Sequence, residues 1–216
     1  MNQVELLLAD LKAGMTVALN PDLEPYLEDG VIGRQLRHPL VYQVPLWSNG
    51  HANALYEQKV KAVKDAFANN KYSSYIFLHE RPYRLNAFSL IQSKLSDTQY
   101  WSLLSEIWTD TENQWQGLDK WKQLLLSNRP SRHYLMNEEE FNLLQSLPDE
   151  VTIYRGCQKG INEDGLSWTL NKSKAKFFAN RFSKEGIILE REIPKSDIIA
   201  VLLGRGESEV ICEVKK

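Results

Sequence analysis

Two glutamates near the end of the chain have the spacing of a pair of cooperating carboxylates. Glu207 and Glu209 flank a serine in the stretch GRGESEVIC, just before a run of apolar residues. Successive side chains of an extended strand alternate between its faces, so residues two apart share a face. The spacing therefore predicts that both carboxylates point the same way at the start of a strand, either as a solvated strand end or as a pair that does chemistry.

Two other polar residues interrupt strand-like segments earlier in the chain. Arg155 lies in EVTIYRGC and Ser167 lies in GLSWTL. An arginine supplies a permanent cation with several donors, which suits an anionic group. A serine hydroxyl can donate to a carboxylate and hold it in one rotamer. Each residue alone fits a surface arginine, a turn serine or a solvated acid equally well, so a functional interpretation depends on their occurring together.

Several common catalytic motifs do not occur in the sequence. The histidines are scattered and form no H-E-x-x-H motif, which disfavours a zinc hydrolase, and we expect no metal. GLSWT lacks the second glycine of a nucleophile elbow. GRGESE lacks the third glycine of a dinucleotide fingerprint, and no P-loop motif occurs. If this protein binds a nucleotide, it must do so with residues other than a dinucleotide fingerprint or a P-loop.

In their order along the chain, YRG, SWT and ESE resemble the arginine, serine and glutamate signature of the ADP-ribosyltransferases, in the branch with cholera-toxin-like, clostridial and vertebrate ecto-enzymes. The resemblance is close over residues 151–216 and looser over the helices before them. The sequence departs from the family pattern in two places. SWT replaces the usual S-T-S or S-x-S, and the segment between Arg155 and Ser167 is short.

The resemblance implies a mono-ADP-ribosyltransferase that uses NAD as co-substrate, releases nicotinamide and transfers ADP-ribose to an arginine of a protein. Breaking the bond between nicotinamide and ribose develops positive charge on the sugar, which a carboxylate stabilises more in the transition state than in the ground state. The resemblance gives this catalytic role to Glu209. It gives Glu207 the orientation of the incoming guanidinium and the removal of its proton. Ser167 would hold the catalytic carboxylate.

The resemblance also implies which residues bind NAD. Arg155 would bind the pyrophosphate and the adjoining ribose, and Gly156 would let the backbone approach the nicotinamide amide. Thr169 takes the third place of the serine motif, beside Ser167. The implied NAD-binding residues also include Tyr154, next to the arginine, and Phe178, on the helix after SWT.

Two other functions stay open. The first is an NAD glycohydrolase of the same fold, in which water takes the place of the acceptor. The second is a non-enzymatic interaction module that keeps the fold, such as a phage or mobile-element protein that occupies a host factor. The chain also resembles toxin-like phage or bacterial effectors that work in the cytoplasm of the producing or host cell. We therefore expect a protein acceptor and no membrane partner; nucleic acid is disfavoured, but DNA, RNA or a small molecule stays open as the acceptor.

Composition sets the limits of these interpretations. The chain has 216 residues, of which 43% are hydrophobic, and a formal net charge of -2. It can therefore bury a core, and it has no overall electrostatic reason to bind nucleic acid or an anionic membrane. Cys157 and Cys212 lack metal-type spacing, which favours a reducing compartment. The N-terminal stretch carries acids and no basic leader, so we expect a cytoplasmic protein.

The elements that precede the predicted site are mainly helices. Helical spacing predicts a short helix on Val4, Leu7, Leu8 and Leu11, and a longer one over residues 54–68. Between them residues 19–33 are predicted as a loop, and SSYIFLH is predicted as a buried strand. Trp101, Trp108 and Trp115 recur every seven residues and predict one packed face of a helical hairpin. MNEEEFNLLQSLP predicts a further helix with Asn137 as its N-cap.

From residue 149 onward the pattern changes to short extended runs. The predicted strands are EVTIYRGC, GLSWTL, GIILEREI, DIIAVLL and ESEVICEV, with a helix, SKAKFFANRF, after the second. The apolar face of that helix favours core packing for Phe177, Phe178 and Phe182, with stacking of one of these rings on nicotinamide as the alternative. The fold class is therefore α+β. As the resemblance implies, a helical N-terminal part precedes a split, mostly antiparallel β-sandwich of the ADP-ribosyltransferase type.

The same patterns suggest a division into two parts. Residues 1–84 form an N-terminal helical region that packs on the rest or binds the target. Residues 85–216 form the ADP-ribosyltransferase-like domain. Within it, helices occupy residues 85–148, and the NAD-binding strands occupy residues 149–216.

Overall fold

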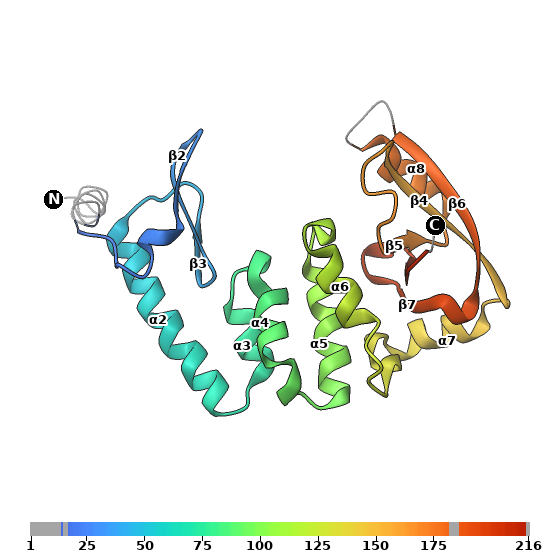
Figure 1. The fold of residues 1–216 in the computed structure, drawn as a ribbon, viewed down its shortest axis with the longest axis horizontal. Coiled ribbons are helices and arrows are strands. Elements are labelled where there is room, and N and C mark those ends of the chain that lie inside the picture. Colours follow the sequence, from blue (N-terminus) through green and yellow to red (C-terminus); the bar gives the residue numbers. More distant parts are fainter. Residues whose placement is uncertain (1–13, 15–16, 182–185, 215–216) are drawn as a thin grey trace, which may run out of the picture. The chain divides into compact units, whose positions relative to one another are not determined.

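The structure, a computed structural model, describes residues 14, 17–181 and 186–214. The chain divides into two compact units, Met1–Lys94 and Leu95–Lys216, whereas the sequence suggested a boundary at residue 84. Both units combine helices with antiparallel strands, which confirms the α+β class (Figure 1). The predicted helix on Val4 to Leu11 and the side chain of Phe182 lie outside the described residues.

In the described part of the first unit, three short strands form an antiparallel meander. They are β1 (Leu27–Gly30), β2 (Gly33–His38) and β3 (Val41–Gln43). The prediction of a loop over residues 19–33 was wrong for β1. Asp and Gly in LEDG are typical of turns, but Gly30 pairs with Gly33 across a two-residue connection, so a local hairpin forms without an apolar pattern. The N-terminal region is therefore not purely helical.

Three helices follow in this unit: α2 (Asn49–Ala68), α3 (Tyr72–Leu78) and α4 (Arg84–Ile91). The predicted helix over residues 54–68 is confirmed, and it begins earlier because the Ser48 hydroxyl accepts a hydrogen bond from the backbone N–H of His51 at 3.3 Å. The strand predicted at SSYIFLH is instead α3. A short apolar run fits a helix or a strand, and here Ile76 is buried while the ring of Tyr75 contacts Phe67 on α2.

The second unit begins with α5 (Asp97–Asp110) and α6 (Leu118–Leu125). Trp101 and Trp108 on α5 are fully buried, as predicted for a packed face. Trp115 is 58% exposed, so its predicted place on that face was wrong. The reason is that α5 ends at Asp110, and Trp115 lies in a separate 3-10 turn where the seven-residue spacing no longer defines a helix face.

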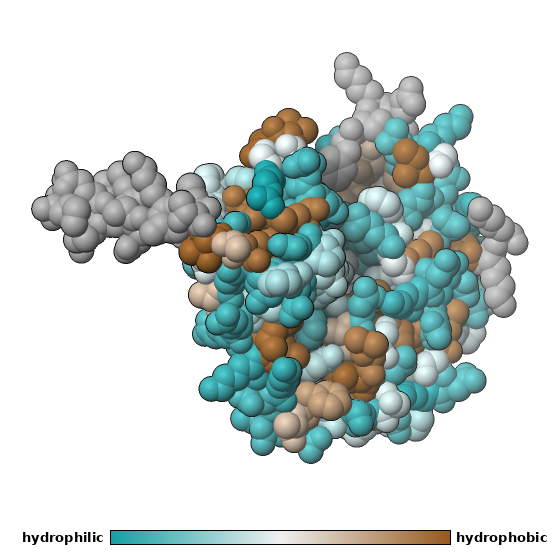
Figure 2. Space-filling view, turned by 60° about the vertical axis from the view of Figure 1, so that its left-hand side comes forward, coloured by the Kyte–Doolittle hydropathy of each residue, from teal (hydrophilic) through white to brown (hydrophobic). Residues whose placement is uncertain are grey.

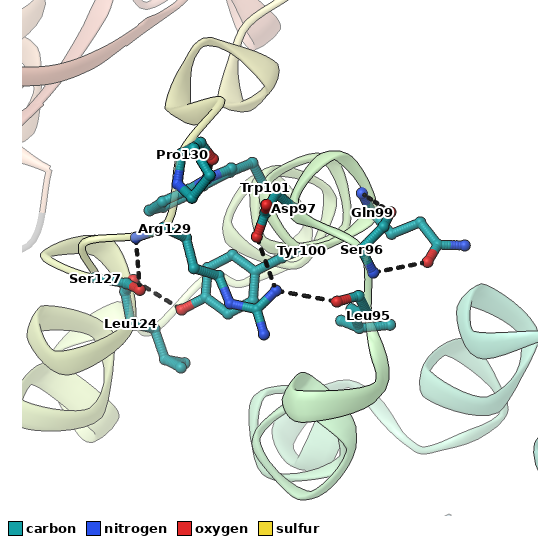
Figure 3. A network of polar contacts seen from close by, with 10 residues as sticks. All are labelled: Leu95, Ser96, Asp97, Gln99, Tyr100, Trp101, Leu124, Ser127, Arg129 and Pro130. Atoms are coloured by element: carbon teal, nitrogen blue, oxygen red, sulfur yellow. Dashed lines mark hydrogen bonds and ion pairs between the residues drawn. The ribbon is translucent and has the colours of Figure 1, made fainter.

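A polar network holds the start of α5 against the segments that follow it (Figure 3). The Tyr100 hydroxyl donates to the Leu124 carbonyl at 2.9 Å, and the Arg129 guanidinium lies 4.5 Å from the Tyr100 ring centre. Arg129 also donates to the Leu95 carbonyl at 3.0 Å. The indole N–H of Trp101 donates to the Pro130 carbonyl at 2.7 Å. These bonds fix the position of α5, and with it the position of Trp108.

The predicted helix after residue 136 is α7 (Glu138–Ser146), and its predicted N-cap is confirmed. The Asn137 side chain accepts from the backbone N–H of Glu140 at 2.9 Å, and the Glu140 carboxylate accepts in return from the backbone N–H of Asn137. The other oxygen of Glu140 accepts from the backbone N–H of Leu203 at 2.7 Å. One buried carboxylate therefore joins the start of α7 to the end of the strand that precedes Leu203.

The described strands of the second unit form one five-stranded antiparallel sheet in the order β6-β4-β5-β8-β7. All five predicted strands occur, as β4 (Glu150–Gln158), β5 (Ser167–Thr169), β6 (Gly186–Pro194), β7 (Ile198–Leu202) and β8 (Glu209–Cys212). β4 and β6 pair along their whole length, side by side in Figure 1. Among the described residues, β4 meets β5 at one pair, Tyr154 with Thr169. The sheet thus consists of two paired halves joined at that point.

The helix after SWT, α8 (Lys172–Asn180), packs on β4 and β6 through its alanines. Ala175 and Ala179 are buried, whereas Phe177 is 60% exposed and Phe178 is half-buried. Core packing was therefore a wrong prediction for Phe177. A Cβ atom on Gly156 would collide with the Ala175 carbonyl oxygen, so the helix backbone lies directly on the strand and leaves no room for a large side chain.

Each unit has its own hydrophobic core. The first contains Leu19, Leu23, Leu36, Leu40, Val41 and Ala52, and the second contains Leu144, Val151, Ile153, Trp168, Ile193, Ile198, Val201, Val210 and Cys212. The face in Figure 2 shows hydrophobic patches set among hydrophilic side chains. No helix in the described ranges is long and apolar enough to cross a membrane.

Candidate active site

Glu209, the predicted catalytic acid, is buried at the start of β8 in the second unit. It is 6% exposed, and it lies opposite Thr169 on β5 and Leu202 on β7. Ser167 lies two residues from Thr169 on the same strand, so its side chain is on the same face as that of Thr169. The Ser167 hydroxyl donates to Oε1 of Glu209. The structure therefore brings together the predicted serine and glutamate, which are far apart in the sequence.

Trp108 is a site residue that the sequence analysis did not identify. Its indole Nε1–H donates to the same oxygen of Glu209, with a distance of 3.2 Å between Nε1 and Oε1. The seven-residue spacing of the tryptophans predicted only core packing for this residue. A signal was present nonetheless, because a buried tryptophan needs an acceptor for its N–H, and a carboxylate is a strong one.

Arg155 lies on β4, and the segment between β4 and β5 folds over its guanidinium. Its Nε donates to the Asn162 carbonyl at 3.0 Å, and its Nη1 donates to the Ser167 carbonyl. A Cβ atom on Gly165 would collide with the guanidinium, so this segment lies directly against it. The shortness of the segment, which departs from the family pattern, here results in a tight cover over the arginine.

The Arg155 guanidinium keeps its positive charge although it is largely buried. Burial lowers the pKa of the Arg155 guanidinium, and Cys157, Asp164 and Glu209 act in the opposite direction. An arginine nevertheless keeps its charge throughout the physiological range. Arg155, Ser167 and Glu209 therefore form a hydrogen-bonded series in which a permanent cation and a carboxylate lie on either side of a serine.

Glu207 does not share a strand face with Glu209, so that prediction was wrong. Glu207 has helical backbone angles after the 3-10 turn Gly204–Gly206, and Ser208 has a left-handed φ of 45°. The strand begins only at Glu209, so side-chain alternation does not relate the two acids. The half-buried Glu207 belongs instead to the loop that leads into β8.

Thr169 fixes this loop. Its hydroxyl donates to the Glu207 carbonyl at 2.7 Å and accepts from the backbone N–H of Asn171 at 3.1 Å. The backbone N–H of Leu170 also donates to the Ser208 carbonyl at 3.1 Å. The predicted third place of the serine motif is therefore occupied by a buried hydroxyl that joins β5 to the loop carrying Glu207.

The other predicted NAD-binding residues lie around β4 and α8. Tyr154 precedes Arg155 on β4, and its ring lies 5.3 Å from the Lys172 ammonium. Gly156 follows Arg155 and packs under α8, so the structure provides a packing reason for glycine there. The ring of Phe178 contacts that of Phe177 with 5.5 Å between ring centres. Tyr154 and Gly156 are the neighbours of Arg155 on β4, and both face the opposite side of the strand from the Arg155 side chain.

The two cysteines are buried and free. Burial raises the pKa of the Cys212 thiol from its ordinary value of 9.0 to about 12. Burial also raises the pKa of Cys157, while Arg155 acts to lower it. Both thiols are therefore neutral near pH 7 and are poor nucleophiles in the folded protein.

None of the predicted site residues lines either of two open hollows on the described surface. One, of about 380 Å³, lies along α2 between Asp22, Tyr56 and Lys64, and the other, of about 560 Å³, lies beside α7. Within the described residues, no group of three or more His, Cys, Asp or Glu side chains could hold a metal ion. The candidate site is thus defined by its hydrogen bonds and buried charges.

No protein-family model, no curated protein and no solved structure matches the chain. The functional interpretation therefore depends on the residues of the site themselves.

Proposed function

We propose that this protein is an NAD-dependent mono-ADP-ribosyltransferase that transfers ADP-ribose to an arginine of a protein acceptor and releases nicotinamide. The observation that carries the proposal is the series of hydrogen bonds from Arg155 to the Ser167 carbonyl and from the Ser167 hydroxyl to Glu209. A solvated strand end would not require a carboxylate that is 6% exposed and receives donors from separate elements.

The reaction assigns one task to each of these residues. The bond between the ribose C1' and the nicotinamide nitrogen breaks, its electron pair leaves with nicotinamide, and the sugar carries cationic charge in the transition state. Glu209 stabilises that charge, with Ser167 fixing its carboxylate. Arg155 binds the pyrophosphate, for which its guanidinium has further N–H groups besides the two that bond to carbonyl oxygens.

The acceptor completes the reaction from the side of the loop before β8. A nitrogen of the acceptor guanidinium forms the new bond to C1', and Glu207 takes its proton. Tyr154, Gly156, Thr169 and Phe178 complete the proposed NAD-binding surface. The resemblance implies a split β-sandwich, whereas the described strands of the second unit form one sheet that narrows to the pair of Tyr154 with Thr169. We propose cytoplasmic action by a toxin-like phage or bacterial effector.

The position of Glu207 favours one alternative function, NAD glycohydrolase activity. Glu207 lies in a turn outside β8, so the geometry of the strand does not hold it beside Glu209. If Glu207 does not reach an acceptor, water takes the place of the guanidinium, and the products are nicotinamide and ADP-ribose. Glu207→Gln separates the two functions, because transfer depends on Glu207 whereas hydrolysis does not.

The test is to incubate the purified protein with NAD, alone and with cell lysate. Nicotinamide release is measured by chromatography, and the mass of acceptor proteins is measured by mass spectrometry. We expect release and a mass increase of one ADP-ribose on an acceptor, both reduced at least a hundredfold by Glu209→Gln. Glu192→Gln is the matched control, because Glu192 is an exposed glutamate on β6, and it should match the wild type.

The outcomes separate the possible functions. Release without a mass increase on any protein would favour the glycohydrolase. Absence of NAD binding and of nicotinamide release in the wild type would overturn both enzymatic proposals and would favour an interaction module.

A further inference from the structure

We propose that Trp108 is a positioning residue for Glu209, and that α5 thereby helps to set the orientation and the ionisation of the proposed catalytic carboxylate. The catalytic part of this inference rests on the proposed function. The contact itself is a property of the protein without NAD, so it can be tested independently.

The two groups meet where water is excluded. Trp108 is 1% exposed and Glu209 is 6% exposed, with 3.2 Å between the indole Nε1 and the carboxylate Oε1. Burial makes an unsatisfied donor or acceptor costly, so each group needs a partner here. The bond therefore does more than accompany packing, because it satisfies the indole donor and gives Oε1 a second donor besides Ser167.

The indole N–H bonds more strongly to the charged carboxylate than to the neutral acid, whose carbonyl oxygen can also accept. An indole N–H is a donor only, whereas the Ser167 hydroxyl can donate or accept. Ser167 could therefore hydrogen-bond to either form of the carboxyl group by turning its O–H. Trp108 instead favours an oxygen that accepts, and donors to the charged form of an acid stabilise it. Trp108 thus stabilises the charged form of Glu209 relative to the neutral form, which Ser167 does less because its hydroxyl can also accept.

The Trp108 indole also contacts a second helix. The Trp108 ring packs edge-on against Trp121 of α6, with 4.9 Å between ring centres and 81° between planes. At the start of α5, the Ser96 hydroxyl accepts from the backbone N–H of Gln99, and the Gln99 side chain accepts in return. Glu209 is consequently held from β5 through Ser167 and from α5 through Trp108.

Other charged groups near Glu209 limit the expected effect. Arg155 on β4 interacts electrostatically with Glu209. Glu207 lies two residues earlier in the chain. Glu140 of α7 binds the backbone N–H of Leu203, next to Leu202, which is the neighbour of Glu209 on β7. Removal of the Trp108 donor should therefore change the titration of Glu209 without abolishing its ionisation, because Arg155 and Ser167 remain.

The first test compares Trp108→Phe with Trp101→Phe. Both changes remove an indole N–H from a buried position on α5, but the N–H of Trp101 binds the Pro130 carbonyl. We expect Trp108→Phe to lower kcat for nicotinamide release on the order of tenfold, with little change in KM, and to shift the acidic limb of the pH profile upward. Trp101→Phe should leave that limb in place, even if it lowers the melting temperature equally.

The second test uses neither of the two tryptophan variants and requires no enzymatic activity. In wild-type protein labelled with ¹⁵N-tryptophan, one indole N–H resonance should move with pH as Glu209 titrates, and it should not do so in Glu209→Gln. If no indole resonance follows Glu209, the inference is wrong whatever the enzyme does. If one resonance does but no nicotinamide is released, the contact stands and the proposed function fails. An equal upward shift of the pH limb in Trp101→Phe would also overturn the inference.

Discussion

Thr169 and Glu207 are joined by a hydrogen bond of 2.7 Å, from the threonine hydroxyl to the glutamate backbone carbonyl. Thr169 also lies directly opposite Glu209 on the neighbouring strand. One buried side chain therefore contacts both the loop that carries Glu207 and the strand that carries Glu209. This bond, the bond from the Leu170 N–H to the Ser208 carbonyl and the left-handed φ of Ser208 all contribute to the relative position of the two acids.

Thr169→Val keeps the shape of the side chain but removes its hydroxyl. We expect it to lower the free energy of unfolding by about 1–3 kcal/mol, because the Glu207 carbonyl and the Asn171 N–H lose a buried partner. Transfer to an acceptor should fall more than NAD hydrolysis, because Glu207 is displaced while Ser167 still holds Glu209. The measurement is the ratio of modified acceptor to free ADP-ribose, with urea unfolding for stability.

Thr152→Val provides the control for this change. Thr152 is exposed on β4, so the same substitution should alter the free energy of unfolding by less than about 0.5 kcal/mol. An unchanged product ratio in Thr169→Val would show that this hydroxyl does not position the acceptor-side acid.

Gly156→Ala tests the close contact between α8 and β4. The added methyl group would collide with the Ala175 carbonyl oxygen and would lie 2.6 Å from the Ala179 backbone nitrogen. The helix must move, so we expect a loss of about 1–3 kcal/mol in the free energy of unfolding, measured by urea titration. In Gly204→Ala the new atom would be 3.7 Å from Thr109, an ordinary contact, so this control should change stability much less. Equal stability of the two variants would contradict the packing described for α8.

The sequence predicted the strands of the second unit because short extended runs, such as GLSWTL, are separated there by segments with Gly, Asn or Ser. It predicted the Asn137 cap for a similar reason, since a cap depends on residues three apart on one chain. It could not predict α3, because the few residues of SSYIFLH fit a helix or a strand equally well until the packing of Ile76 decides. Local sequence patterns therefore predicted an element correctly only where the residues fitted one kind of secondary structure and not the other.

The candidate site shows the same limit. The pairing of Ser167 with Glu209 was expected from the resemblance, which includes the contact between strands. The donor from Trp108 comes from a helix about a hundred residues earlier in the chain, and its seven-residue spacing with Trp101 is fully explained by core packing. The turn at Glu207 depends on the left-handed φ of Ser208, which a serine adopts rarely and only in a suitable tertiary context.

The Cys212 thiol predicts a dependence of stability on alkaline pH. Its pKa is raised by burial from 9.0 to about 12, so the folded protein resists ionisation of this group. Below pH 9 the thiol is neutral in both the folded and the unfolded protein, so the free energy of unfolding keeps the full contribution of this group. Between pH 9 and 12 the unfolded chain ionises first, so the free energy of unfolding falls as pH rises.

Removing this thiol should reduce the fall. Urea titrations at pH 8 and at pH 10.5 should show a smaller decrease in Cys212→Ala than in the wild type, whatever the difference between the two proteins at pH 8. The Cys212 thiol is fully buried on β8. If the free energy of unfolding fell equally with pH in the wild type and in Cys212→Ala, that result would contradict the effect of this burial on the thiol.

The pairing of Tyr154 with Thr169 has a consequence for how the protein would respond to NAD. Arg155 belongs to the β4–β6 half of the sheet and Glu209 to the β5–β8–β7 half, and among the described strands these halves share one backbone pair. A dinucleotide bound by both residues would act as a crosslink across that junction. Amide hydrogen exchange at Tyr154 and Thr169 should then slow more on NAD binding than exchange within β4 and β6, where the ladder is already continuous.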